Sequence, residues 1–473
     1  MKMQLSIFRA EAAALSAILI LASGCSTSYD MAVAARSSVL AGDAAYATRC
    51  AETMSRTPAD ANLGKFELAR LRQLSGDFAG SSAILGPQLD DFFVDESEGP
   101  ILKMDKIGGN MLAGTLGDDR TIPYDVPAYE LIFALQYQAL NSYHLGKRDN
   151  ARVYLRRATA AQEQLKEKAE QDAAADGGDA ADDGDQAANI ATASGQIRQD
   201  LDPVANAVRS AYENALAWYL MGTLFALERE IGNDAISYGQ AVALCPELRQ
   251  FVSPQPGPGE DVIVVFEESL VDIPEPVKIP LPLVGGTISS VDFPTYRKSA
   301  YVPSRIGVFA RGANTTALVR AVNVQALAYR SLRDRLAGIV TRNITRAALK
   351  IAAQQTVNHI STGSTWGNAA LRVGVFAFNA VSTVAAKADT RSWQTLPQCV
   401  QLCRIRLPQG ARSLAVINQA NGRTLDVALP AGGKGPWLVW ISDIHAYSTV
   451  SVVPLASGAA TWRRDGSLLG TKY

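Results

Sequence analysis

The same arrangement recurs three times in the first half of the chain: an apolar helical stretch, a glycine turn and a second helical stretch with small residues near its start. The turns are centred on Gly76, Gly146 and Gly232. Glycine tolerates the positive backbone angle φ at which a helix ends and the chain reverses, and small side chains let antiparallel helices approach closely. This pattern predicts packed helix pairs over residues 37–253.

The spacing of these turns is that of a helical repeat. Gly76 and Gly146 are separated by about two periods of roughly 34 residues, so the blocks resemble tetratricopeptide (TPR) units. Stacked units of this kind form a concave surface that binds peptides or helices. Tyrosines of this region would either line that surface or pack in the core; the candidates are Tyr124, Tyr129, Tyr137, Tyr143 and Tyr154, of which Tyr129, Tyr137 and Tyr143 are the predicted partner-binding residues.

An insert over residues 166–199 interrupts the repeat. It is rich in Ala, Gly and Asp and has no aromatic residue. Because such a segment buries too little apolar surface to offset the entropy of ordering, we expect a disordered acidic loop. A calcium site is the alternative, although the Asp-x-Asp-x-Asp-Gly spacing of calcium loops is absent.

The second half begins after a proline- and glycine-rich stretch, 254–259. We expect a buried strand over 261–266 and a proline-rich edge strand over 277–281. An apolar stripe at helical spacing predicts a long helix over 316–353. A second, very apolar helix over 368–386 is expected to fold back on it as a hairpin, with membrane insertion as the alternative. These elements form the predicted domain 260–397.

From Cys399 onward the hydrophobic pattern changes to short strands separated by turns, among them Asn421-Gly422. Both residues of that turn tolerate positive φ, which favours a tight hairpin. The pattern predicts a small antiparallel β-sandwich over 398–473. The complete chain is therefore expected to be an α+β protein with a helical solenoid first and a β-rich part last.

The N-terminus has the layout of a bacterial secretory signal: Lys2 and Arg9, an apolar run over 12–22, and small residues before Cys25. That layout predicts a lipoprotein in which residues 1–24 are removed, Cys25 receives acyl chains such as palmitate, and residues 25–36 form a tether. An uncleaved anchor or a buried helix is the alternative. By resemblance to Gram-negative lipoproteins, Ser26 after the cysteine implies the outer membrane, with the protein facing the periplasm.

Three segments carry a resemblance to a family of uncharacterised Gram-negative lipoproteins with a TPR-like N-terminal half. They are 139–152, the strand 262–266 with 279–282, and 389–404, which contains the motif Asp-Thr-Arg-Ser-Trp-x-Thr-Leu-Pro. The resemblance implies this architecture and a place in the cell envelope. It implies no reaction.

No catalytic, cofactor or metal motif is present. The chain has three histidines, His144, His359 and His445, and lacks the Gly-x-Ser-x-Gly and phosphate-loop patterns. A net charge of −1 gives no reason to expect nucleic acid as a partner. Disulfides are permitted outside the cytoplasm, and the pairing is open among Cys50, Cys245, Cys399 and Cys403.

A column of basic residues on the long helix, Arg342, Arg346 and Lys350, is the second candidate binding surface. These residues are spaced by four, so they share one helix face. Such a face would meet an acidic partner or anionic lipid head groups, or would simply be solvated.

These observations predict a non-catalytic, lipid-anchored scaffold or regulator that binds a protein of the cell envelope. The alternative is a protein that binds or processes glycans of the cell wall or an exopolysaccharide. In that alternative Trp393, Trp437 and Trp440 would be exposed platforms on which sugar rings stack.

Overall fold

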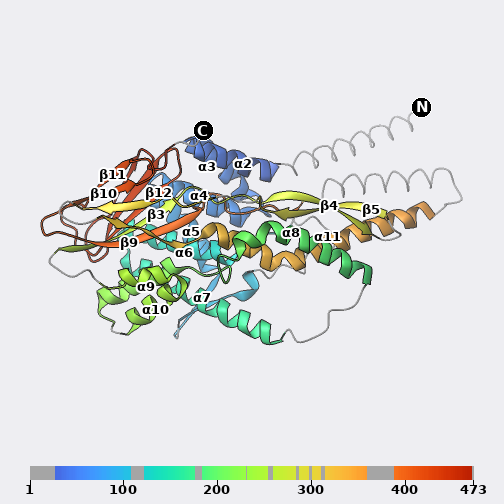
Figure 1. Ribbon diagram of the computed structural model, residues 1–473, viewed down its shortest axis with the longest axis horizontal. Coiled ribbons are helices and arrows are strands. Elements are labelled where there is room, and N and C mark those ends of the chain that lie inside the picture. The colour runs from blue at the N-terminus through green and yellow to red at the C-terminus, as the bar shows by residue number, and fades with distance from the viewer. Residues whose placement is uncertain are drawn as a thin grey trace, which may run out of the picture.

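The computed structural model has a mixed α+β architecture, in which helices pack around several β-sheets (Figure 1). The structure describes residues 27–97, 99–107, 122–175, 184–230, 232–253, 259–283, 287–297, 301–310, 315–359 and 388–470. The signal segment, Cys25 and the predicted helix over 368–386 lie outside these residues. Within them, no helix is both long enough and apolar enough to cross a bilayer.

The first half consists of helices joined by turns, with one small hairpin. Its elements are α2 (Thr27–Leu40), α3 (Ala44–Arg56), α4 (Ala61–Leu74), α5 (Phe78–Asp90), β1 (Phe93–Glu96), β2 (Gly99–Leu102), η1 (Met104–Lys106), α6 (Ala128–His144), α7 (Arg148–Ala175), α8 (Gly184–Ala205), α9 (Ala215–Glu228), α10 (Asn233–Leu244) and η4 (Pro246–Phe251). Gly76, Gly146 and Gly232 have φ angles of 83°, 71° and 100°. The predicted glycine turns and helix pairs are therefore confirmed.

Two of the predicted flexible segments are helical. Residues 27–36, expected to belong to a tether, form most of α2, and Arg36 donates hydrogen bonds to the carbonyl oxygens of Leu270 and Gln394 at 3.1 Å each. The expected disordered loop over 166–199 is mostly covered by α7 and α8. Every fourth residue from Ala193 to Ala205 is buried, which creates an apolar stripe that the average composition concealed.

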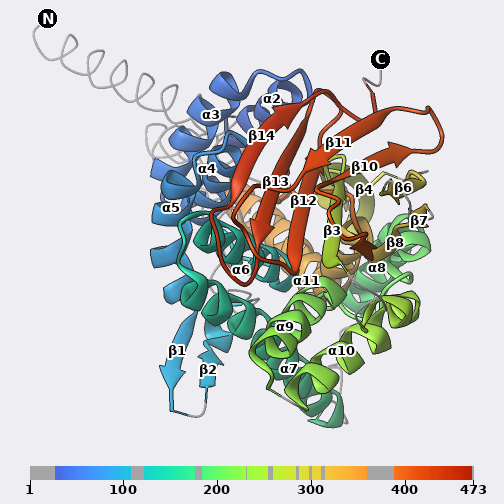
Figure 2. The same cartoon turned by 90° about the vertical axis from the view of Figure 1, so that its left-hand side faces the viewer.

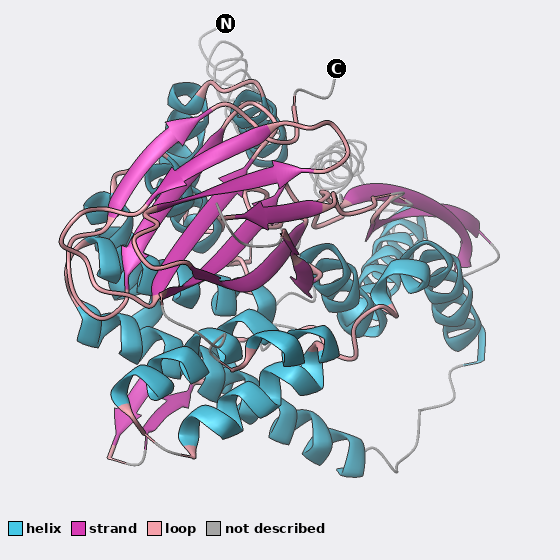
Figure 3. Ribbon diagram, turned by 60° about the vertical axis from the view of Figure 1, so that its left-hand side comes forward, coloured by secondary structure: helices cyan, strands magenta, loops and turns pink. Residues whose placement is uncertain are grey.

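A six-stranded sheet lies against the helices, as Figures 2 and 3 show. Its order is β14-β13-β12-β3-β9-β8, and only β3 and β12 run parallel. The strands are β3 (Glu260–Glu268), β8 (Val319–Val322), β9 (Cys399–Leu407), β12 (Trp437–Asp443), β13 (Ser448–Pro454) and β14 (Thr461–Asp465). The predicted boundary at 398 is therefore wrong, because strands from both sides of it share one sheet.

The remaining strands form a four-stranded sheet, in the order β11-β10-β6-β7, and a two-stranded ribbon of β4 and β5. They are β4 (Glu275–Leu283), β5 (Thr287–Thr295), β6 (Ile306–Phe309), β7 (Thr316–Ala317), β10 (Ser413–Asn418) and β11 (Thr424–Ala428). The predicted Asn421-Gly422 turn is confirmed: β10 and β11 are antiparallel, and Gly422 has a φ of 72°.

The long helix α11 spans Val324–His359 and packs against α8 and the ribbon of β4 and β5 (Figure 1). Its predicted stripe is confirmed between Ala326 and Ile344, whose members are at most 5% exposed. The predicted start at 316 is wrong, because residues 316–317 form β7 and residues 319–322 form β8. β-Branched residues at 315, 316, 319 and 322 favour extended backbone there.

Candidate functional site

The motif segment Asp389–Leu396 joins the helical half to the sheet. Trp393 is fully buried, stacks on Phe66 of α4 with ring centroids 4.8 Å apart, and contacts the Tyr137 ring of α6 edge-on at 5.8 Å. Its Nε1–H donates to Thr395 at 2.9 Å. The segment therefore threads between helices instead of lying on the surface.

Glu130 of α6 holds the backbone of this segment. Its carboxylate accepts hydrogen bonds from the Trp393 N–H at 3.0 Å, from the Tyr129 hydroxyl at 3.0 Å and from the Tyr124 hydroxyl at 2.8 Å. Burial raises the pKa of Glu130 to about 7, although these three hydrogen bonds lower it. Glu130 is thus a satisfied group that changes charge near neutral pH.

Glu67 of α4 holds the next residues in the same manner. It accepts from the Gln394 N–H and from the Thr395 hydroxyl, both at 2.6 Å. Burial raises the pKa of Glu67 to about 7, against the effect of these hydrogen bonds. Two carboxylates from different helices therefore fix Trp393, Gln394 and Thr395.

Arg391 ties the start of the segment to the helical half. Its guanidinium pairs with Asp389 at 2.6 Å and Asp60 at 3.3 Å, and donates to the carbonyl oxygens of Ala59 at 2.9 Å and Ile122 at 3.1 Å. Burial opposes ionisation of Asp389, but the Arg391 charge holds the pKa of this carboxyl below its usual value. Arg391 is therefore a structural cation.

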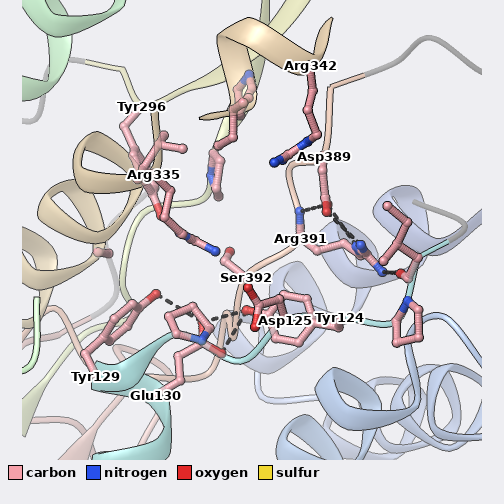
Figure 4. A pocket seen from close by; sticks show the side chains of 18 residues that line it. Tyr124, Asp125, Tyr129, Glu130, Tyr296, Arg335, Arg342, Asp389, Arg391 and Ser392 are labelled. Atoms are coloured by element: carbon pink, nitrogen blue, oxygen red, sulfur yellow. Dashed lines mark hydrogen bonds and ion pairs between the residues drawn. The ribbon is translucent and has the colours of Figure 1, made fainter. Parts of the chain in front are cut away.

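A cleft with a free volume of about 100 Å³ opens beside this segment, between α11, the start of α6 and the ribbon of β4 and β5 (Figure 4). The described residues that line it are of two chemical kinds. The charged or polar ones are Asp125, Glu130, Arg335, Arg342, Asp389, Arg391 and Ser392. The apolar or aromatic ones are Ile122, Pro123, Tyr124, Pro127, Tyr129, Pro274, Pro294, Tyr296, Ala328, Leu332 and Ile339.

Two groups in the cleft lack protein partners. Arg335 donates from Nε to the carbonyl oxygen of Ser331 at 3.1 Å, and within the described residues its two terminal nitrogens have no acceptor. Ser392 is 4% exposed, and its hydroxyl makes no hydrogen bond in the described part of the chain. Figure 4 shows the Arg335 guanidinium pointing toward Ser392. A buried polar group without a partner costs about 1–3 kcal/mol, so the Ser392 hydroxyl needs an explanation, whereas Arg335 is only half-buried.

The three predicted tyrosines are core residues. Tyr129, Tyr137 and Tyr143 are 2%, 1% and 5% exposed. The Tyr137 hydroxyl donates to Glu267 at 2.8 Å, and the Arg70 guanidinium lies over its ring at 4.1 Å. The predicted partner-binding surface is therefore wrong, because the sheet covers α6 where a solenoid alone would leave it open.

Of the predicted basic column Arg342, Arg346 and Lys350, only Arg342 is among the described residues that line the cleft. Arg342 lines the cleft, and Figure 4 shows its guanidinium directed inward. Arg346 is half-buried, so neither residue is a fully solvated surface charge. The side chain of Lys350 lies outside what the structure describes. Of the basic residues on this helix, the sequence prediction therefore selected one that lines the cleft and missed Arg335.

The exposed tryptophan platforms of the glycan alternative are absent. Trp393 and Trp437 are 0% exposed and Trp440 is 2% exposed. Trp440 belongs to strand β12, and its ring lies 6.3 Å from that of Tyr137 on α6. These residues pack the core, so they offer no face on which a sugar ring stacks.

The cysteines and histidines belong to no group that could hold a metal ion among the described residues. Cys50, Cys245, Cys399 and Cys403 are buried free thiols. His144 stacks on Phe78 with ring centroids 3.5 Å apart.

His445 follows strand β12. Its Nε2 lies 3.0 Å from the Ser269 hydroxyl and its Nδ1 lies 3.0 Å from the Gly470 carbonyl oxygen. Asp443 instead accepts from Ser448, from Ser467 and from backbone N–H groups. The imidazole therefore ties the C-terminal segment to the end of β3.

Comparisons of this chain with protein-family models, with curated proteins and with solved structures give no match. Function is therefore inferred from the site itself.

Proposed function

We propose that this chain is a lipid-anchored lipoprotein of the outer membrane, facing the periplasm, that binds a partner in the cell envelope without transforming it. Acyl chains on Cys25 would attach it to the bilayer just before helix α2. Two or more such chains make membrane attachment stable. The helix pairs, TPR-like in this proposal, serve as the scaffold that carries the binding site instead of forming that site themselves.

The observation that supports binding is the cleft beside Asp389–Leu396. It contains donors on Arg335 and Ser392 that no described protein group satisfies. Concave sites with apolar walls and a few convergent polar groups are typical of ligand-binding sites. We therefore place the predicted partner site here and not on the buried tyrosines.

The cleft supports binding over catalysis. A serine nucleophile needs a neighbouring base such as histidine or lysine. Among the described residues that line the cleft there is no histidine, lysine or cysteine, so none of them offers Ser392 such a base. The proposal accordingly includes no reaction, no cofactor and no nucleic acid.

Site-specific photo-crosslinking in intact cells tests the proposal on the full chain. A photoreactive amino acid replaces Ile339, which lines the cleft, and in a matched control replaces Ile236, which is 61% exposed on α10. We expect a discrete protein adduct from position 339, no such adduct from position 236, and loss of the adduct in a Cys25→Ala variant. Absence of an adduct at 339, or the same adduct from both positions, contradicts the proposal.

Metabolic labelling tests the anchor separately. Labelled palmitate should enter the wild-type protein and should be absent from the Cys25→Ala variant. Equal labelling of the two proteins, or no label in either, contradicts the lipid anchor while leaving the cleft to be judged by the crosslinking result.

A further inference from the structure

The unpartnered donors of the cleft come from two elements that are far apart in sequence. Arg335 belongs to α11, and Ser392 lies in the motif segment that follows Asp389. Arginine presents a planar fork of N–H groups that matches the two oxygens of a carboxylate or phosphate. A buried serine hydroxyl beside such a fork adds a donor for the same anion. An anionic group between Arg335 and Ser392 would therefore accept hydrogen bonds from both residues.

The charges around the cleft favour an anion with a single negative charge. Arg335, Arg342 and Arg391 supply three positive charges. Asp125 and Asp389 line the cleft and Asp60 pairs with Arg391, so three negative charges oppose them. Glu130 is the remaining carboxyl among the described residues that line the cleft. With Glu130 protonated these charges balance, so a carboxylate adds less repulsion than a phosphate dianion.

The walls of the cleft indicate what carries the carboxylate. Pro274, Pro294, Leu332 and Ile339 line one part of it, and Tyr296 stacks on Tyr329 with ring centroids 4.3 Å apart. A free volume of about 100 Å³ accommodates a carboxylate and a few further non-hydrogen atoms, since a water-sized group needs about 10–15 Å³ of such volume. Rigid apolar walls of this size favour a short apolar stem over a polar one.

We infer that the cleft binds a monovalent carboxylate on a short apolar stem, as found at the free C-terminus of a peptide that ends in a small apolar residue. Arg335 and Ser392 are the residues that bind it. This inference rests on the proposed function and specifies the chemistry of its partner. Capture of a chain terminus by backbone or side-chain donors is an established mode of peptide recognition.

Glu130 makes the binding depend on pH. The groups that face it are the Tyr124 and Tyr129 hydroxyls and the Trp393 N–H, with Arg335, Tyr296 and Glu67 acting over longer distances. Burial raises the pKa of Glu130 to about 7. As pH rises through about 7, Glu130 becomes negative and gives the cleft a net negative charge. Affinity for a carboxylate should therefore fall over that interval.

Isothermal titration of the full chain tests this inference. The probes are a short peptide with a free carboxylate at a C-terminal alanine, the same peptide amidated, N-acetylalanine, and inorganic phosphate. We expect the free peptide and N-acetylalanine to bind, and the amidated peptide and phosphate to bind at least about tenfold more weakly, as expected from loss of a charged hydrogen bond. If N-acetylalanine binds and the free peptide does not, the ligand is a small carboxylic acid. If the free peptide binds more tightly than N-acetylalanine, the ligand is the C-terminus of a peptide chain.

Two variants and one control assign the binding groups. Arg335→Gln should weaken binding about ten- to hundredfold and Ser392→Ala about three- to tenfold. Arg333→Gln is the control, because Arg333 lies on the same helix, does not line the cleft and pairs with Asp202 at 3.3 Å. The Arg333→Gln variant should bind the free peptide with the affinity of the wild type. Thermal unfolding should show that all three variants are folded.

The results separate this inference from the proposed function. Equal affinity of the free and amidated peptides, or an Arg335→Gln variant that binds as the wild type does, overturns the carboxylate assignment. A cleft that binds no carboxylate but still yields the adduct from position 339 overturns only this inference. Loss of that adduct overturns the proposed function.

Discussion

Two groups of polar residues around the segment Asp389–Leu396 differ in how completely their hydrogen bonds are made. In the first group, the carboxylates of Glu67, Glu130 and Glu267 each accept hydrogen bonds from two or more groups. In the second group, the hydroxyl of the buried Ser392 and the terminal nitrogens of the half-buried Arg335 have no hydrogen bond within the described residues. Complete satisfaction marks a group that stabilises the fold, whereas open donors in a cleft mark a group kept for a ligand.

The largest effect is expected at Arg391, whose guanidinium pairs with two carboxylates. Arg391→Ala leaves the buried Asp60 and the half-buried Asp389 without their cation and removes hydrogen bonds to Ala59 and Ile122. Such a change costs about 3–5 kcal/mol of the free energy of unfolding, which urea unfolding measures. Arg333→Ala, which removes a partly exposed ion pair, should cost less than about 1 kcal/mol. Equal losses in both variants would show that burial of Arg391 does not matter.

Titration of the satisfied carboxylates should make the fold less stable as pH rises. The pKa values of Glu67 and Glu130 are about 7 in the folded protein, against an ordinary value of about 4.5. The folded state therefore holds more protons between these values. Each group should lower the free energy of unfolding by up to roughly 1.4 kcal/mol per pH unit in that interval, with no contribution to the slope at higher pH.

Glu67→Gln isolates one of these groups. Glutamine cannot ionise, so the slope of unfolding free energy between about pH 5 and 7 should fall by about one group's share relative to wild type. The Glu96→Gln variant is the control, because Glu96 is exposed on β1 and should leave the slope unchanged. A Glu67→Gln variant with the wild-type slope would mean that Glu67 is ionised throughout this range.

A smaller effect is expected at Ser442, a buried serine beside Glu267 in the first group. Ser442 is 3% exposed, donates to Glu267 and accepts from Arg70 at 3.1 Å. Ser442→Ala leaves both groups short of a partner, so urea unfolding should show a loss of about 1–2 kcal/mol. An unchanged unfolding free energy would indicate that Arg70 and Glu267 compensate for the missing hydroxyl.

The elements that could be predicted from the sequence are those whose cause is local. Glycine turns at Gly76 and Gly146 and the stripe from Ala326 to Ile344 depend on neighbouring residues, and both are confirmed. The exposure of Tyr137 could not be predicted, since the strand that covers it contains Trp440, which comes much later in the chain. Hydrophobic periodicity shows which residues are buried together but not which distant element buries them.

The cleft was missed for a related reason, although one signal of it was present. Arg335 follows Leu332 by one helical turn and precedes Ile339 by another, so it occupies a position within an apolar stripe. A charge at such a position indicates either a buried pair or a binding site. What distinguishes Arg335 from other arginines of α11 is that its guanidinium points toward Ser392, a residue far away in the sequence.

The unfolding free energy of the Ser392→Ala variant, measured in urea without added carboxylate, tests most directly the claim that this cleft is left open for a ligand. If the Ser392 hydroxyl has no partner, its removal should leave the free energy unchanged or raise it by about 1 kcal/mol. A loss of about 1 kcal/mol or more, as expected for Ser442→Ala, would show that the hydroxyl is already satisfied within the fold and would contradict the account.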